Sequence, residues 1–206
     1  MPLSRLNPEQ LDAATAPIGQ NLIIASAGTG KTSTIVGRIA HLLSTGVQPH
    51  EILLLTFTNK AAAEMIERIA TYFSEELASQ IDAGTFHAIS YRWLKKIDHR
   101  IVLKQPSELK TLFRSVYEKR RFDHIDAGVQ AYAANYLYDY YSLYQNTTID
   151  KSFADWMRNK ESEHAPFVDI YQDICDEFEE LKVRYGFVNF NDLLIMMRDR
   201  VASMNV

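Results

Sequence analysis

Hydrophobic and polar positions fall into blocks along the first 86 residues, and the spacing within the blocks changes from one block to the next. The apolar runs at 21–25 and 51–57 are short and continuous, as in the buried strands of parallel sheets. Residues 30–46 and 59–73 instead place apolar side chains at helical spacing, and 80–86 has the form of a third short strand. This alternation predicts an α/β domain with parallel strands and right-handed crossovers.

Capping residues mark where the predicted helices begin and end. Asn7 can cap a first helix at 6–16, and Gln10 stands at the capping-box position three residues later. Gly46 follows the last apolar position of the second helix, as a terminating glycine does. Asn59 is the expected cap of the third helix.

The pattern becomes mostly helical after residue 86. An amphipathic helix is predicted over 167–185, stopped by Gly186. We therefore expect two domains, residues 1–90 with the α/β pattern and residues 91–206 as an all-α unit. Within the second, one helical stripe carries Tyr132, Tyr136, Tyr140 and Tyr144. Such a stripe is either part of a core or a platform on which bases stack.

Charge is distributed unevenly, although the 206-residue chain has a net charge of only -4. Residues 86–124 hold ten Lys/Arg and four Asp/Glu, whereas residues 161–180 hold eight Asp/Glu and no Lys/Arg. The two segments are either solvated helix faces or a polarised surface. In the second case, the cluster Lys119–Arg121 would meet the phosphates of a DNA duplex.

Cysteine usage and hydropathy indicate in which cellular compartment the protein is expected. Cys175 is the only cysteine, so no disulfide can form within the chain, which fits the reducing cytoplasm. The first ten residues lack the apolar segment of a signal peptide, and no run approaches the length of a membrane span. We expect a cytoplasmic protein with no membrane partner.

The segment "ASAGTGKT" at 25–32 carries the clearest chemistry. It lies between an apolar run and a helix, and it matches the phosphate-binding pattern G-x-x-x-x-G-K-[ST], except that Ala25 replaces the first glycine. Small residues let backbone N–H groups approach phosphates, and the helix N-terminus adds partial positive charge. Lys31 is suited to neutralise the β and γ phosphates, and the Thr32 hydroxyl to ligate Mg²⁺.

Three more segments, taken with this loop, resemble the UvrD/Rep family of superfamily 1 DNA helicases. "LNPEQLDAAT" is similar to that family's Q motif, and "LLLTFTNKAAAEM" and "AGTFHAIS" are similar to its first two DNA-contacting motifs. All four occur in the family's order within residues 6–90, and "FVNFNDLL" resembles a segment that precedes the Walker B strand. The resemblance implies a partial RecA-like P-loop NTPase domain followed by a helical inserted subdomain. It also implies an ATP-driven motor that moves 3′ to 5′ on DNA and unwinds duplexes.

The resemblance also assigns residues to ligands. Gln10 is implied to read the adenine edge. The alternative is that Gln10 only closes the capping box. Lys31 and Thr32 are implied to be catalytic, with Thr32 also on Mg²⁺. The implied ATP-binding set is Gln10, Ala25, Ser26, Ala27, Gly28, Thr29, Gly30, Lys31, Thr32 and Ser33. Implied contacts to single-stranded DNA and to single-strand/duplex junctions are Phe57, Thr58, Asn59, Thr85 and His87, with Phe57 stacking on a base.

Two features depart from the family pattern. Ser33 stands where relatives often carry an arginine that stacks on the base, which puts that contact in doubt. No apolar strand ends in the Asp-Glu of a Walker B motif, because the run before Asp199 has helical spacing. We therefore expect an N-terminal fragment of a longer helicase that binds nucleotide weakly and hydrolyses none by itself.

Other functions remain open at this point. The chain is the helicase part of a RecB/AddA-like helicase-nuclease if a nuclease domain follows. It is a nucleotide-switch binding module without unwinding if the whole protein is short. For the helicase, the resemblance implies a role in DNA repair or replication, with partners among the proteins of those processes.

Overall fold

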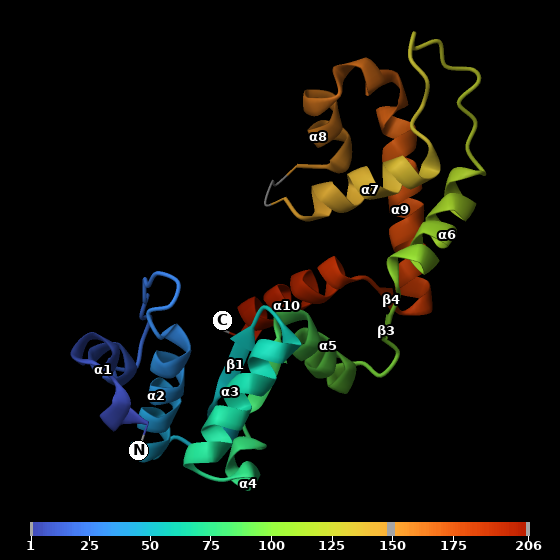
Figure 1. The fold of residues 1–206 in the computed structure, drawn as a ribbon. Helices are drawn as coiled ribbons and strands as arrows, with labels where there is room; N and C mark the ends of the chain where they lie inside the picture. Colours follow the sequence, from blue (N-terminus) through green and yellow to red (C-terminus); the bar gives the residue numbers. More distant parts are fainter. Residues whose placement is uncertain (1, 148–150, 205–206) are drawn as a thin grey trace. The chain divides into compact units, whose positions relative to one another are not determined.

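The computed structural model of the chain describes residues 2–147 and 151–204 (Figure 1). They divide into two units, residues 1–89 and 90–206. The first contains a 3-10 turn at Leu3–Arg5, α1 (Pro8–Thr15), α2 (Lys31–Ser44), a 3-10 turn at Pro49–Glu51, β1 (Leu53–Thr56), α3 (Asn59–Tyr72), α4 (Glu75–Ala78) and β2 (Asp82–Thr85). α5 (Phe86–Ile97) begins in the first unit and continues in the second.

The first helix forms as the capping pattern predicts and packs along α2 (Figure 1). Asn7 Oδ1 accepts a hydrogen bond from the Gln10 amide at 2.8 Å, and Gln10 Oε1 accepts one from the Asn7 amide at 3.1 Å. Gly37 permits the close approach of the two segments, because a Cβ there would lie 2.6 Å from Leu6 Cδ1. The glycine thus sets where the chain before α1 rests on α2.

A parallel pair of strands, β1 and β2, confirms the predicted α/β fold class. Leu53 pairs with Asp82, and Thr56 pairs with Thr85. The core of this unit is formed by apolar residues from α2, α3, α4, β1 and the segments just before the two strands, namely Val36, Ile39, Ile52, Leu54, Ile69, Ala78 and Ile81. Because the two strands are parallel, their carboxyl ends lie at one edge of the sheet.

Two details of the first unit differ from the sequence prediction. The segment 21–25 forms no strand, and Leu22 and Ile24 are 87% and 89% exposed. A strand needs a neighbour for its backbone N–H and C=O groups, and no described strand pairs with this segment. The cap of α3 is Thr58 rather than Asn59, because Thr58 Oγ1 accepts the Ala61 amide at 3.1 Å.

The second unit is predominantly helical. Its remaining elements are β3 (Val102–Leu103), α6 (Pro106–Tyr117), α7 (Ala134–Gln145), α8 (Phe153–Lys160), a 3-10 segment at Ser162–Phe167, α9 (Val168–Tyr185), β4 (Phe187–Val188) and α10 (Phe190–Met204). The helix α9 ends at Gly186 as predicted, with φ at +67°. The segment before Asp199 is helical as predicted, within α10.

One element of the second unit contradicts the all-α expectation. Val102 pairs in parallel with Phe187, and Leu103 with Val188, which joins segments more than 80 residues apart. Two-residue strands are too short to produce a recognisable hydrophobic alternation, so the sequence pattern carries no sign of them.

No helix within residues 2–147 and 151–204 is both long enough and apolar enough to cross a lipid bilayer.

Candidate nucleotide-binding site

The glycine-rich turn between residue 25 and α2 has an open backbone. Gly28 and Gly30 have φ values of +79° and +83°, which glycine adopts without strain. Gly30 is the N-cap of α2 and offers no side chain to the first-turn amides, and that turn contains no acidic residue. The amides at this helix N-terminus are therefore suited to bind an anion.

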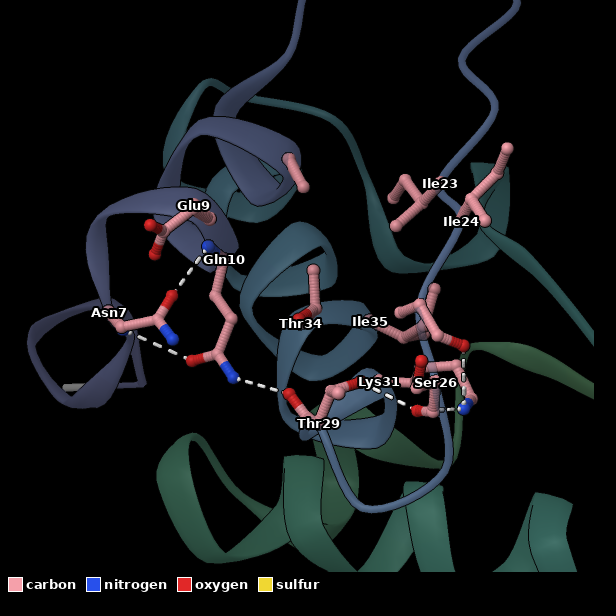
Figure 2. A pocket seen from close by; sticks show the side chains of 12 residues that line it. Asn7, Glu9, Gln10, Ile23, Ile24, Ser26, Thr29, Lys31, Thr34 and Ile35 are labelled. Atoms are coloured by element: carbon pink, nitrogen blue, oxygen red, sulfur yellow. Dashed lines mark hydrogen bonds between the residues drawn. The ribbon is translucent and has the colours of Figure 1, made fainter.

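Lys31 lies across this turn. Its Nζ donates to the carbonyl oxygens of Ser26 at 2.7 Å and Ala25 at 3.1 Å (Figure 2). Thr29 Oγ1 also donates to Ser26 O, at 2.8 Å. These bonds hold the ammonium group over the loop, where phosphates would meet it without a large rearrangement.

Gln10 connects α1 to the same turn. Beside its capping bond, its Nε2 donates to Thr29 O at 2.9 Å (Figure 2). Gly30 has a φ of +83°, where a side chain would be strained, and a Cβ there would lie 2.5 Å from Gln10 Nε2 and displace that amide. The side-chain amide has a second proton and a second lone pair, and it can therefore form one further bond of each kind. Capping and ligand contact are compatible.

A cavity of about 520 Å³ adjoins the turn. Figure 2 shows α1 on one side of it, α2 behind, and the Ile23–Ser26 segment opposite α1. Its volume lies within the range of roughly 300–1,000 Å³ that is usual for ligand pockets. The cavity is lined by Asn7, Glu9, Gln10, Ala13, Ile23, Ile24, Ala25, Ser26, Thr29, Lys31, Thr34 and Ile35. The predicted residues Ala27, Gly28, Gly30, Thr32 and Ser33 complete the turn and the start of α2 outside this lining.

A second group of predicted residues lies at the carboxyl edge of the parallel sheet. Phe57 directly follows β1 and is 94% exposed. The strand register places it beside Phe86, which follows β2, and the two ring centroids are 6.2 Å apart. Ligands of open parallel sheets bind beyond the carboxyl ends of the strands. Phe86 was absent from the predicted contacts, although the register of the two strands identifies it.

The other members of this group have local structural roles as well. Thr58 caps α3, and Asn59 is the exposed first residue of that helix. Thr85 Oγ1 accepts the Ala88 amide at 3.2 Å and so caps α5. His87 is half-buried on the first turn of α5. The structure thus brings all five predicted DNA-contacting residues to neighbouring helix starts.

The basic and acidic segments of the second unit pair with each other. Lys119 Nζ and Arg120 Nη2 contact the two oxygens of Glu177 at 2.7 and 2.9 Å. The hydrogen bond from Lys119 is the main cause of the lowered pKa of the Glu177 carboxyl, with further contributions from both cations. Arg121 is exposed. Two of the three cations in the Lys119–Arg121 cluster therefore form ion pairs with Glu177. This favours the interpretation of the basic and acidic segments as solvated helix faces over that of a DNA-binding surface.

The tyrosine stripe also has a structural explanation. Tyr132 precedes α7 and stacks on buried His164, with ring centroids 3.8 Å apart. Tyr140 donates to Glu161 at 2.8 Å, and Tyr144 is half-buried. Tyr136 is 54% exposed. Three of the four rings are thus packed, as in a core.

A glycine-rich turn that runs into a helix beside parallel strands defines a class, the P-loop α/β proteins. The chain belongs to the UvrD/REP helicase N-terminal domain family, whose model matches residues 6–203. The resemblance inferred from the motifs is thereby confirmed.

Individual relatives agree with this membership. The chain is 32% identical over 201 residues to the ATP-dependent DNA helicase PcrA of Leuconostoc citreum, a match that covers 96% of the chain and 26% of that protein. It is 30% identical over 203 residues to DNA helicase II of Haemophilus influenzae, covering 94% and 26%. The chain therefore spans about a quarter of the length of these relatives.

Proposed function

We propose that this chain is the nucleotide-binding N-terminal part of an ATP-dependent 3′–5′ DNA helicase. In this proposal, residues 1–90 form the first part of a RecA-like ATP-binding core, and residues 91–206 form its helical inserted subdomain. Family membership supports the helicase, and the chain's relatives are DNA helicases by name. The observation that carries the proposal is the loop at 26–30, with Lys31 already bonded across it.

The loop's geometry fits a triphosphate. Both glycines have backbone angles that turn the chain sharply, and a Cβ at Gly28 would meet no atom within 4 Å. Backbone amides of residues 26–32 would bind the phosphate oxygens, and Lys31 would move from carbonyl oxygens to phosphates. The proposed nucleotide set is the predicted one, with Gln10 at the base.

Thr32 would hold Mg²⁺ through its hydroxyl. It lies half-exposed in the first turn of α2, one residue after Lys31. A Mg²⁺ ion takes several waters and phosphate oxygens, so one protein ligand suffices for binding. No group of three or more acidic, histidine or cysteine side chains that could hold a metal occurs among residues 2–147 and 151–204.

ATP hydrolysis needs residues beyond the proposed nucleotide-binding and Mg²⁺-binding residues. P-loop enzymes place a carboxylate at the end of a buried strand to hold the metal shell. The residues that follow β1 and β2 are Phe57 and Phe86. We therefore expect the chain by itself to bind nucleotide without releasing phosphate, and the whole protein to hydrolyse ATP with residues outside those discussed.

Single-stranded DNA would bind at the carboxyl edge of the sheet. The exposed Phe57 ring offers a face for base stacking, which every base can use. Thr58, Asn59, Thr85 and His87 would lie along the sugar-phosphate backbone. Translocation would then couple nucleotide turnover to movement along the strand. Base stacking suits such movement because it does not depend on the DNA sequence.

The nucleotide part of the proposal is tested by Lys31→Ala in the 206-residue chain. A fluorescent ATP analogue with Mg²⁺ should bind at least about tenfold more weakly to the variant, because a hydrogen bond to a charged group contributes roughly 1.5–3 kcal/mol. Lys60→Ala is the matched control, since Lys60 is 87% exposed and lies outside the loop. Equal affinities for Lys31→Ala and the unaltered chain would contradict the proposal.

A further inference from the structure

Arg38, a half-buried residue in the middle of α2, binds the end of α1. Its guanidinium donates hydrogen bonds to the backbone carbonyl oxygens of Ala14 at 3.2 Å, of Ala16, and of Pro17 at 3.3 Å. The last carbonyl groups of a helix have no partner within the helix, and a cation is favourable at that end. One planar group thus satisfies a helix end that lies 21 to 24 residues earlier in the chain.

The preceding residue, Gly37, allows α1 to lie close against α2. A Cβ added to Gly37 would lie 2.6 Å from Leu6 Cδ1, just before α1, and 3.3 Å from the Cβ of Ala14, near its end. Ala14 is fully buried. Two consecutive residues of α2 therefore hold α1, Gly37 by close packing and Arg38 by hydrogen bonds.

Gln10 lies between these two points of attachment. Its side chain extends from α1 to the glycine-rich loop, where Nε2 donates to Thr29 O (Figure 2). Because the reach of a side chain is limited, the place of the Gln10 amide above the loop depends on how α1 is seated on α2. Gln10 and Thr29 line the cavity beside the loop, and Arg38 lies outside that lining. Arg38 therefore acts on the cavity through α1.

The same hydrogen bonds fix the chain where it leaves α1. Ala16 and Pro17 begin the segment that leads to residues 23–26, the wall of the cavity opposite α1 (Figure 2). Asn21 Nδ2 also donates to Pro17 O, at 2.9 Å, and so holds this segment in a turn. The two walls of the cavity are therefore joined in the chain at the carbonyl groups that Arg38 binds.

We propose that Arg38 is a positioning residue for recognition of the base. By fixing the end of α1, it keeps the Gln10 amide where it meets the edge of adenine, without touching the nucleotide itself. This role rests on the proposed binding of nucleotide at the loop, with Gln10 at the base. Loss of Arg38 should change the preference among bases and spare the phosphates, because Lys31 is held by carbonyl oxygens of the loop itself.

Three ligands separate recognition of the base from recognition of the phosphates, namely Mg²⁺-ATP, Mg²⁺-ITP and Mg²⁺-tripolyphosphate. Inosine carries an oxo group where adenosine carries the amino group on its six-membered ring, and tripolyphosphate has no base. Each affinity is measured on the 206-residue chain by competition with a fluorescent ATP analogue. The unaltered chain should bind ATP about three- to tenfold more tightly than ITP, since ITP loses one hydrogen bond to Gln10.

Arg38→Ala should reduce this ATP preference to below about twofold and leave the tripolyphosphate affinity unchanged. Arg38→Lys keeps the charge without the planar fork, so it should give an intermediate preference, and it supplies the comparison if Arg38→Ala does not fold. In a Gln10→Ala background, Arg38→Ala should alter the preference no further, because the two residues act in series. Arg68→Ala, which replaces an exposed arginine of α3, is the control and should leave the preference unchanged.

An unchanged ATP preference in Arg38→Ala would overturn this role, and equal weakening of all three ligands would show that Arg38 supports the whole loop instead. The proposed function is tested separately. If the unaltered chain binds tripolyphosphate and Lys31→Ala weakens that binding, the loop holds phosphates whatever happens at Arg38. If that chain nevertheless has no preference for ATP over ITP, Gln10 does not read the base and the role of Arg38 is refuted. Binding of none of the three ligands would contradict both proposals.

Discussion

Replacement of Lys182 by methionine should destabilise the second unit by about 3 kcal/mol. Lys182 lies on α9 with its side chain only 2% exposed. Its Nζ is 2.8 Å from Glu179 Oε2 and 2.9 Å from Asp192 Oδ2, so it joins α9 to α10. Methionine preserves the apolar stem of the side chain and removes the charge.

The magnitude follows from what the substitution leaves behind. Removal of one partner from a buried ion pair typically costs roughly 3–5 kcal/mol, because the other charge stays desolvated. Asp192 is 14% exposed and stays largely buried, whereas Glu179 is 33% exposed and can turn toward water. The lower end of that range therefore applies.

Tryptophan fluorescence during urea unfolding provides the assay. Trp93 and Trp156 are the only tryptophans, and both belong to the second unit, so their signal reports this unit. Lys110→Met is the matched control. Its ion pair with Asp139 lies at the surface, with exposures of 32% and 61%, and its loss should cost less than about 1 kcal/mol.

A double variant checks the cause. Asp192→Asn should cost about 1–2 kcal/mol less in the Lys182→Met background than alone, because the stranded charge is then removed. If Lys182→Met costs no more than Lys110→Met, or if the two changes at 182 and 192 are additive, the buried ion pair does not hold α9 and α10 together.

Three further predictions concern backbone strain, acid sensitivity and DNA contact. Gly186→Ala should lower the free energy of unfolding in urea by at least about 1 kcal/mol more than Gly128→Ala does. Both glycines have positive φ, but only at Gly186 would the added Cβ lie 2.5 Å from a backbone oxygen. Equal decreases in the free energy of unfolding would contradict this explanation. The lowered pKa of Glu177 stabilises the fold above the ordinary pKa of 4.5, and this contribution is lost as the pH falls through the folded-state value. Glu177→Gln should therefore destabilise the second unit at pH 7 and have little effect near pH 2, and a constant difference across this range would refute the assignment. Phe57→Ala should weaken binding of a single-stranded oligonucleotide about 5- to 100-fold in fluorescence anisotropy without lowering the melting temperature, since the ring is 94% exposed; Phe73→Ala is the control, and equal effects of the two changes would reject the stacking role.

Local sequence signals predicted much of this fold. The Asn7–Gln10 box and the end of α9 at a glycine could be predicted from local residue patterns, and both form as expected. The strands β1 and β2 follow from two apolar or small-residue runs separated by a helical segment, a pattern that favours parallel pairing, and the two strands do pair in parallel.

Features that depend on distant partners were not predictable in this way. The run at 21–25 is as apolar as β1, yet apolarity does not reveal whether a neighbouring strand is present to complete its hydrogen bonds. The pairing of β3 with β4 joins residues 102–103 to 187–188 and leaves no local pattern.

The candidate site shows the same division. The loop at 25–32 is continuous in sequence, so its members could be named from the pattern alone. Phe86 emerges only from the register of two strands, which pairs Thr56 with Thr85. The roles of all these residues toward nucleotide and DNA remain predictions.

Amide hydrogen exchange of the loop, with and without saturating Mg²⁺-ATP, is the most direct test of nucleotide binding at this site. The amides of Ala27 to Thr32 should gain protection on addition of nucleotide, because phosphate oxygens then accept their hydrogen bonds, and Lys31→Ala should reduce that gain. Unchanged exchange at these amides while nucleotide is bound would show that the glycine-rich turn does not hold the phosphates.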